Sequence, residues 1–226
     1  MNTFAARSRQ RGLTLVEVLV GMVAGFFVLG ATIVLVVGLG GENRRLLLEA
    51  RLNQDMRAAM DIVTRDLRRA GYWQNAQAGA WHLGLVGSPV DYASTGYPTV
   101  APAPGAAASS QITYAYSRDN DDTTATNEQF GFRLSSGALQ MNIGGGYQDL
   151  TDVGSTTVTA FTVAPRPAQV IQIACVTTCT VNCPTLEVRE YQVTLTAQSA
   201  SDATVQRTII SDVRVRNDRT TGACPT

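Results

Sequence analysis

The sequence predicts an α+β fold, with one long N-terminal helix followed by an antiparallel β-sheet domain. Apolar residues dominate or recur at helical spacing through the first 71 positions, and no proline interrupts them. After residue 110 the pattern changes to short segments of alternating polar and apolar residues, rich in β-branched and aromatic side chains. Because no helical pattern separates these segments, we expect them to pair as antiparallel strands.

Length and composition limit the possible functions. A chain of 226 residues suits one domain with an appended segment. Its 18 basic residues, all arginine, balance 18 acidic residues, so the protein as a whole is not predicted to attract nucleic acid. G-x-S-x-G, H-E-x-x-H and phosphate-binding glycine motifs are missing, and the single histidine, His82, does not supply a catalytic pair. We therefore predict no enzyme activity and no cofactor.

The first apolar segment, residues 13–41, has the length of a membrane span. No charge occurs between Val18 and Gly41, which is enough residues to cross ~30 Å of hydrocarbon as a helix. Arg7, Arg9 and Arg11 precede it, so the positive-inside rule places the N-terminus in the cytoplasm. A single-pass anchor would explain this pattern but not Glu17, because a carboxylate in such a segment is costly without a partner.

A resemblance to a known protein family explains why a carboxylate occurs at Glu17. The run RGLTLVEVLV, which begins at Arg11, resembles the class III signal of type IV pilins and pseudopilins. In that family a peptidase removes a short basic leader after a glycine, and the new N-terminal residue is methylated. The resemblance implies that residues 1–12 are the leader, that Gly12 is its last residue, and that Leu13 becomes the mature N-terminus with Glu17 fifth. The family more often has Phe at that first position, so Leu13 is a departure, although an apolar one.

The resemblance also implies an assembly role for the first half of the helix. In the family, the glutamate compensates the N-terminal amine of a neighbouring subunit. The physics agrees, because an ion pair in a low-dielectric setting is strong once formed and a lone buried charge is not tolerated. Gly21 and Gly25 form a G-x-x-x-G pattern, which permits close approach of two helices. Residues 13–41 are thus expected to cross the membrane and later to lie in a filament core.

The second half of the helix, residues 42–71, is predicted to be amphipathic. Apolar residues recur every three or four positions, at Leu48, Leu52, Met56, Met60, Val63, Leu67 and Ala70. Gly71 is a suitable C-terminal stop. We expect this stripe to pack on the sheet domain. The end of the segment, RDLRRAGY, resembles PilW-type minor pilins and the related J-type minor pseudopilins of type II secretion.

Residues 72–226 are predicted to form the β-rich globular domain, which is expected in the periplasm and later outside the cell. A proline-rich stretch of small residues before position 110 is expected to be irregular. The expected strands are QITYAYS, EQFGFRL, ALQMNI, TVTAFTV, VIQIACV, LEVREYQVTL and TVQRTIISDVRV. The clearest turn chemistry lies in SSGALQ and IGGGYQD.

A polar run between residues 117 and 128 offers a calcium alternative. Asp119, Asp121, Asp122 and Glu128 could supply oxygen ligands to Ca²⁺. The spacing departs from the EF-hand pattern at Thr123 and lacks its glycine. We therefore favour a solvated loop, and predict no metal site.

The chain has four cysteines, three of them in the run CVTTCTVNC. Zinc would need a fourth ligand from far along the chain, and only one histidine is present. An even number of cysteines after a membrane-targeting segment favours disulfides in an oxidising compartment. The sequence leaves all three pairings open among Cys175, Cys179, Cys183 and Cys224.

These observations together predict a minor pilin that acts in type IV pilus assembly, in a tip or priming complex. The resemblance implies other minor pilins, the major pilin, the prepilin peptidase and a large tip adhesin as partners. It also implies a place in the inner membrane before assembly and on the pilus at the cell surface afterwards. A minor pseudopilin of type II secretion is the nearest alternative. A ligand- or DNA-binding pilus module, using Arg207, Arg214 and Arg216, is the alternative of another class.

Overall fold

The computed structural model describes Gly12, residues 14–74, Tyr97, residues 99–121 and 123–222, and Cys224, without the side chains of residues 39–41. The chain divides into two compact units, Met1–Leu47 and Leu48–Thr226. One helix, α1 (Leu15–Leu67), contributes to both units. Each unit is described by itself.

The first unit contains the apolar part of α1. The helix begins after Thr14, whose carbonyl oxygen accepts a hydrogen bond from the backbone N–H of Val18 at 3.2 Å. The Thr14 hydroxyl accepts a second, from the Glu17 N–H at 3.4 Å, which is the usual work of a helix N-cap. From Leu15 to Gly38 every residue is exposed. Such a surface is stable only against lipid or other apolar helices.

In the second unit, α1 buries one stripe of side chains. The buried residues are Leu52, Met56, Ala59, Met60, Val63 and Leu67, with Ala70 just beyond the helix end. This is the predicted stripe, and it packs against the sheets as expected. The helix ends at Leu67 and a turn continues to Gly71. Gly71 has a φ of 76°, which suits glycine, and its N–H donates to the Ala115 carbonyl at 2.8 Å.

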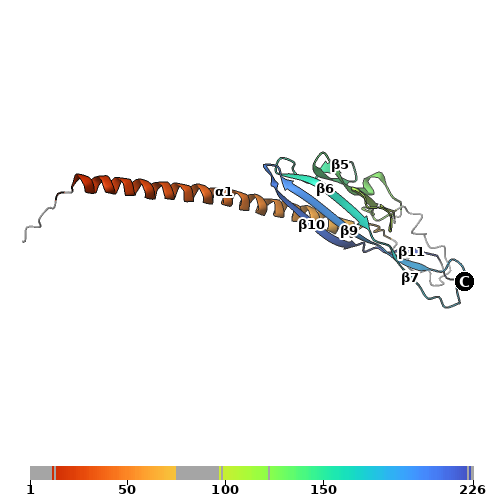
Figure 1. The fold of residues 1–226 in the computed structure, drawn as a ribbon. Helices are drawn as coiled ribbons and strands as arrows, with labels where there is room; N and C mark the ends of the chain where they lie inside the picture. The colour runs from red at the N-terminus through yellow and green to blue at the C-terminus, as the bar shows by residue number, and fades with distance from the viewer. Residues whose placement is uncertain are drawn as a thin grey trace, which may run out of the picture. The chain divides into compact units, whose positions relative to one another are not determined.

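The first sheet has five antiparallel strands in the order β1-β2-β3-β4-β5, of which Figure 1 labels the edge strand β5. Its strands are β1 (Val100–Ala101), β2 (Gln111–Ala115), β3 (Gln129–Ser135), β4 (Ala138–Ile143) and β5 (Tyr147–Asp149). Ser136 and Gly137, both at positive φ, turn β3 into β4 as the SSGALQ pattern predicts. Strands β1 and β5 are too short to have shown a sequence pattern.

Two further antiparallel sheets have three strands each. One has the order β10-β9-β6, and the other the order β11-β8-β7. Their strands are β6 (Thr156–Pro165), β9 (Glu190–Ser199), β10 (Asp202–Arg214), β7 (Gln169–Gln172), β8 (Thr185–Val188) and β11 (Arg219–Thr221). The described strands of the domain are thus antiparallel, as predicted, and they are divided among three sheets, a division that the sequence pattern did not show.

One predicted strand is divided between two sheets. LEVREYQVTL was expected to be continuous, but β8 ends at Val188 and β9 begins at Glu190. Val188 and Arg189 are both buried, which breaks the alternation of a flat strand. The Arg189 carbonyl accepts from the Val215 N–H at 3.0 Å, and its guanidinium donates to the Asn217 carbonyl at 2.7 Å. These contacts mark the point where the chain leaves one sheet for the other.

The main core lies among α1 and the first two sheets. The helix stripe packs with residues of both sheets, including Ile112, Phe132, Leu139, Phe161, Tyr191, Val193 and Leu195. The two sheets also meet directly, because the Val158 N–H donates to the Gly137 carbonyl at 2.8 Å. No described residue of the β11-β8-β7 sheet belongs to this core.

Candidate assembly site

The residues expected to direct processing lie at the start of the chain. Gly12 is exposed, and Glu17 lies in the first turn of α1 with its side chain exposed. Leu13, Arg7, Arg9 and Arg11 lie outside the described residues. Within the described part of the chain, no cationic side chain pairs with the Glu17 carboxylate. Its place in the first helical turn favours a negative charge, because the N-terminal end of a helix carries partial positive charge.

Gly21 and Gly25 lie one turn apart on α1. A Cβ atom built at either position would meet nothing within 4 Å. Their backbone is therefore open, and the G-x-x-x-G spacing would permit a neighbouring helix to approach, a role that stays a prediction. The flanking surface is strongly apolar, with side chains such as Phe26 and Phe27 about three-quarters exposed.

The same part of α1 is long and apolar enough to cross a membrane. None of its most apolar window is buried inside the protein, which distinguishes it from the core helix of a soluble domain. This apolar part of α1 therefore needs an apolar environment that the described residues of the chain do not provide. Lipid and neighbouring apolar helices are the two environments that accept such a surface.

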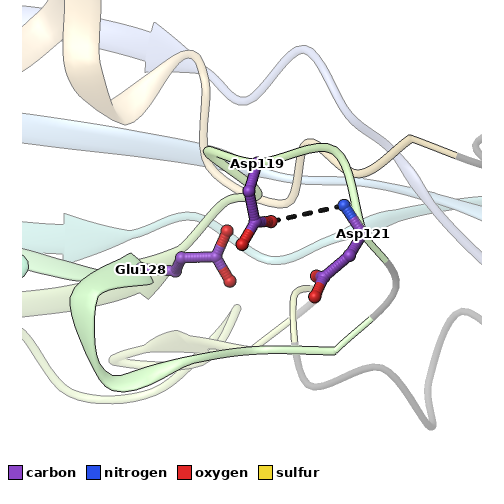
Figure 2. Close-up of side chains that lie close together, drawn as sticks. All are labelled: Asp119, Asp121 and Glu128. Atoms are coloured by element: carbon purple, nitrogen blue, oxygen red, sulfur yellow. Dashed lines mark hydrogen bonds between the residues drawn. The ribbon is translucent and has the colours of Figure 1, made fainter.

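Three acidic side chains of the polar loop, Asp119, Asp121 and Glu128, lie close together (Figure 2). Oxygen atoms of Asp119, Asp121 and Glu128 lie within 4.8 Å of one another, whereas Asp122 lies outside the described residues. Glu128 is fully buried and accepts from the Tyr97 hydroxyl at 2.6 Å, the Arg118 N–H at 2.5 Å and the Ala125 N–H at 3.0 Å. Burial opposes its ionisation, but the Ala125 N–H and the Tyr97 hydroxyl prevail and lower the pKa of Glu128.

This arrangement makes Glu128 a structural anchor. Its two carboxylate oxygens already accept protein donors, and the Tyr97 hydroxyl also lies 3.0 Å from a carboxylate oxygen of Asp121. A buried carboxylate satisfied in this way closes the loop without an added cation. Glu128 is therefore a structural residue of the loop, whereas Asp119 and Asp121 are exposed, and the prediction that the loop binds no metal stays a prediction.

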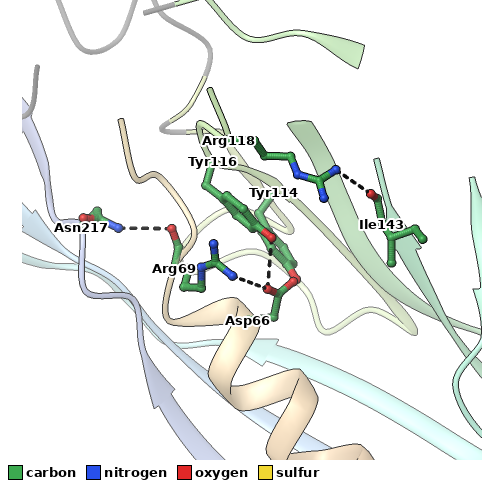
Figure 3. Close-up of polar contacts among 7 residues, drawn as sticks. All are labelled: Asp66, Arg69, Tyr114, Tyr116, Arg118, Ile143 and Asn217. Atoms are coloured by element: carbon green, nitrogen blue, oxygen red, sulfur yellow. Dashed lines mark hydrogen bonds and ion pairs between the residues drawn. The ribbon is translucent and has the colours of Figure 1, made fainter. Parts of the chain in front are cut away.

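Asp66 joins the end of α1 to strand β2 (Figure 3). Asp66 is buried, and its carboxylate accepts from the hydroxyls of Tyr114 and Tyr116, the second at 3.3 Å. Arg69, one turn further on, approaches it to 3.9 Å. Burial and the Asp66 carboxylate raise the pKa of Tyr116 to about 12 and that of Tyr114 well above its usual value. Both hydroxyls therefore stay protonated and remain donors at neutral pH.

Stacked aromatic rings and guanidinium groups extend the contacts around Asp66 along the five-stranded sheet. The rings of Tyr116 and Phe130 lie parallel with their centroids 3.9 Å apart. The Arg69 guanidinium lies 4.4 Å from the Tyr116 centroid, and that of Arg118 lies 5.5 Å from the Phe130 centroid. Arg118 also donates to the Ile143 carbonyl at 3.2 Å (Figure 3). Cations and rings arranged in this way attract one another through the ring quadrupoles.

Sequence reasoning noted the RDLR segment only as a resemblance and missed what Asp66 does. The available signal was an aspartate beside the apolar stripe, between Val63 and Leu67, together with two tyrosines two positions apart, Tyr114 in β2 and Tyr116 just after it. The pairing itself joins residues 48 positions apart, which no local pattern can show.

The four cysteines form two disulfides. Cys175 bonds Cys224, and Cys179 bonds Cys183. The first links the segment after β7 to the segment after β11, and the second closes a short loop between β7 and β8. The disulfide prediction is thus confirmed, and the structure selects one of the three pairings.

The arginines considered for nucleic-acid binding are partly neutralised. Arg207 pairs with Glu49 at 3.2 Å, and Arg214 pairs with Asp218 at 2.9 Å. Arg216 has no carboxylate partner among the described residues. His82 lies outside them.

Two family matches agree with this geometry. The family described as "Prepilin peptidase-dependent protein B" matches residues 45–215, which is more than half of the chain. The "Prokaryotic N-terminal methylation motif" matches residues 7–33, which include Gly12, Leu13 and Glu17. No curated protein and no solved structure matches the chain. Families of this type are structural rather than catalytic, and they depend on the prepilin peptidase and on pilus components. The chain is therefore a type IV pilin-like protein and belongs to the prepilin peptidase-dependent protein B family.

Proposed function

We propose that the chain is a minor pilin of the PilW type, which takes part in type IV pilus assembly in a tip or priming complex with other minor pilins. One observation carries the proposal. Glu17 is the single carboxylate in the apolar segment 13–41, and it lies five positions after Gly12 within the matched methylation motif. A charge at this spacing in a membrane-length helix needs a partner, and a neighbouring subunit can provide one.

In this proposal, the peptidase cuts after Gly12 and the amine of Leu13 becomes methylated. Before assembly the helix spans the inner membrane, with its N-terminus in the cytoplasm and the sheet domain in the periplasm. During assembly the Glu17 carboxylate pairs with the N-terminal amine of an adjacent subunit. The pair forms where water is scarce, so breaking it leaves a buried charge, at a cost of about 3–5 kcal/mol.

The remaining features fit the same role. The open backbone at Gly21 and Gly25 gives a neighbouring helix room to approach. The sheet domain, held to the end of α1 through Asp66, would face outward at the cell surface. There it would contact other minor pilins and the major pilin, and would help to display a large tip adhesin.

Intact-mass analysis tests the proposal first. Membrane extracts from cells with the prepilin peptidase should contain a chain that lacks residues 1–12 and carries one methyl group on Leu13. Extracts from cells without the peptidase should contain the full chain. An uncut chain in both strains would falsify the pilin assignment.

A matched pair of variants then tests Glu17. Glu17→Gln should still be cleaved but should fail to support surface pili, because the amide carries no charge to pair with the amine. Glu42→Gln removes a carboxylate from the same helix and should leave piliation near the wild-type level. Equal piliation by the two variants would contradict the role of Glu17.

The nearest alternative, a minor pseudopilin of type II secretion, shares the leader, the helix and the peptidase. Deletion of the gene separates the two. Loss of surface pili with normal secretion supports the proposed minor pilin, whereas loss of secretion with normal pili supports the pseudopilin.

A further inference from the structure

An arginine-lined hollow lies where the end of α1 meets the end of β10. It has a volume of about 660 Å³ and is lined by Arg68, Asp212, Arg214 and Arg216. Three arginines against one aspartate leave two positive charges in excess. All four side chains are exposed.

The backbone beneath the hollow is fixed by hydrogen bonds between the two segments. The Arg216 N–H donates to the Arg68 carbonyl at 3.1 Å. The Asn217 side-chain amide donates to the Arg69 carbonyl at 3.2 Å (Figure 3). It also donates to the Ala70 carbonyl at 3.0 Å. Arg68 and Arg216 therefore project from a common rigid base, which lowers the entropy lost when they bind a partner.

The charges in the hollow are unequally paired. Arg166 holds Asp212 at 2.7 Å, and Arg214 holds Asp218 at 2.9 Å. Arg68 and Arg216 have no carboxylate partner among the residues that the structure describes. The excess charge of the hollow thus belongs to these two guanidiniums.

A purely structural explanation accounts for one of them. Arg68 directly follows the C-terminal end of α1, where the carbonyl groups favour a nearby cation. Arg214 and Arg216 come from the end of β10 and the residues after it, so the helix end does not explain why they converge on Arg68. Bringing like charges together is unfavourable without a counter-charge.

We propose that this hollow is a docking site for an acidic segment of another protein subunit, whose carboxylates pair with Arg68 and Arg216. The planar guanidinium fork matches a carboxylate in two parallel hydrogen bonds. The proposal rests on the proposed function only for the identity of the partner, a neighbouring subunit of the assembly.

Protein carboxylates fit this hollow better than nucleic acid does. Asp212 lies in the lining and would repel a continuous run of phosphates, whereas separate carboxylates can approach Arg68 and Arg216. Among the described residues no aromatic side chain lines the hollow, so bases would find no stacking platform there. The zero net charge of the chain also gives no long-range attraction to a polyanion.

A binding experiment on the full chain in mild detergent tests the proposal. The probes are a short Asp/Glu-rich peptide, its Asn/Gln counterpart, a DNA duplex and inorganic phosphate. We expect the acidic peptide alone to bind well. The double variant Arg68→Glu/Arg216→Glu should weaken this binding by about tenfold or more, because both contacts become repulsive.

The control variant is Arg51→Glu/Arg57→Glu, which makes the same charge change on the exposed face of α1. It should bind the acidic peptide like the wild type. Equal binding by the wild type and the Arg68→Glu/Arg216→Glu variant would overturn the proposal. Duplex binding tighter than peptide binding, and lost in that variant, would make the hollow a nucleic-acid site instead.

Photo-crosslinking in cells tests the identity of the partner. Ile210 is 59% exposed and lies two positions before Asp212, on the same face of β10, so a photoreactive residue there samples the hollow. The adduct should depend on Arg68 and Arg216 and should map to an Asp- or Glu-containing segment of another subunit. An adduct with a second copy of this chain alone would overturn the stated occupant.

Failure of this inference is distinguishable from failure of the proposed function. The Arg68→Glu/Arg216→Glu variant leaves the leader intact, so peptidase-dependent loss of residues 1–12 should be unchanged. Normal cleavage without peptide binding would contradict only the proposed docking site. Peptide binding by a chain that is never cleaved would contradict only the proposed minor-pilin function.

Discussion

The two ends of the sheet domain are held together by different forces. At one end, α1 and two sheets share a core in which Phe132, Phe161 and Leu195 are almost wholly buried. At the other end, the β11-β8-β7 sheet exposes Val170 and Ile171 and is closed by disulfides. A small sheet that buries little apolar surface needs covalent links to remain ordered. We therefore expect core substitutions to destabilise the whole domain and loss of disulfides to act locally.

The largest effect is expected from a cavity in the shared core. Phe132→Ala should lower the free energy of unfolding by about 3–5 kcal/mol, because it removes a fully buried ring that cannot be replaced by water. Val170→Ala, at an exposed position of β7, should change it by less than about 0.5 kcal/mol. Urea titration of the full chain in detergent, followed by near-ultraviolet circular dichroism, measures both. Similar losses from the two variants would contradict the contrast between the regions.

The second-largest effect is expected from loss of the Cys175–Cys224 disulfide, which links the segments that follow β7 and β11. Cys175→Ser/Cys224→Ser opens a loop with a sequence separation of 49 and should cost about 2–4 kcal/mol. Cys179→Ser/Cys183→Ser, which opens a loop with a separation of 4, should cost less by roughly 2 kcal/mol in the loop-entropy model.

Hydrogen exchange shows where the loss occurs. In the Cys175→Ser/Cys224→Ser variant, amide exchange should accelerate in β7, β8 and β11, while β9 keeps its protection. Equal acceleration in β9 would mean that the two regions open as one cooperative unit.

Substitution of Asp66, which links the end of α1 to β2, is expected to lower the free energy of unfolding by an intermediate amount. Asp66→Asn keeps the volume but removes the charge that accepts the Tyr114 and Tyr116 hydroxyls, and should cost about 1.5–3 kcal/mol. A double-mutant cycle with Tyr114→Phe should give a coupling energy of about 1 kcal/mol or more. Additive losses would indicate that the hydrogen bond between Tyr114 and Asp66 contributes little to the free energy of unfolding.

The predicted features of the molecule are those that depend on local spacing. The apolar stripe of α1 follows from the helical period, so the sequence predicts the burial of Leu52, Met56, Val63 and Leu67, which the structure confirms. The N-terminal methylation motif also follows from a linear pattern, because it matches residues 7–33, whereas the leader cut after Gly12 and the role of Glu17 stay predictions. The strand ALQMNI was also correctly bounded, because a tight turn precedes it and a glycine run follows it.

The features that sequence reasoning missed depend on contacts between distant residues. The break at Arg189 comes from hydrogen bonds to residues more than twenty positions away, and LEVREYQVTL contains no glycine or proline to signal it. The cysteine pairing depends on β7 and β11 flanking the same strand, β8. Glu128 resembled a metal ligand because the partner that occupies it, Tyr97, precedes it by 31 positions.

A pH-dependent effect is expected at Glu128. Its pKa lies below the usual 4.5 in the folded protein, so the ionised form contributes stability that is present above pH 4.5 and is lost as the pH falls through the lowered pKa. Glu128→Gln should remove this acid-side loss and flatten the dependence of unfolding free energy on pH below 4.5. Urea titrations at several acidic pH values measure it. The same acid slope in both proteins would assign the loss to other carboxylates.

The smallest effect is expected at an exposed ion pair on α1. Arg65 and Asp61 lie 2.6 Å apart, but their side chains are 75% and 61% exposed, so water screens the attraction. Asp61→Asn should cost about 0.3–0.5 kcal/mol at low salt and close to nothing at high salt. Asp66→Asn makes the same chemical change one turn and a residue further along the helix, at a buried position, and should keep its cost at high salt because burial prevents screening. A salt-insensitive loss of stability in Asp61→Asn, or a salt-sensitive loss in Asp66→Asn, would contradict the expectation that burial decides how strongly salt screens each aspartate.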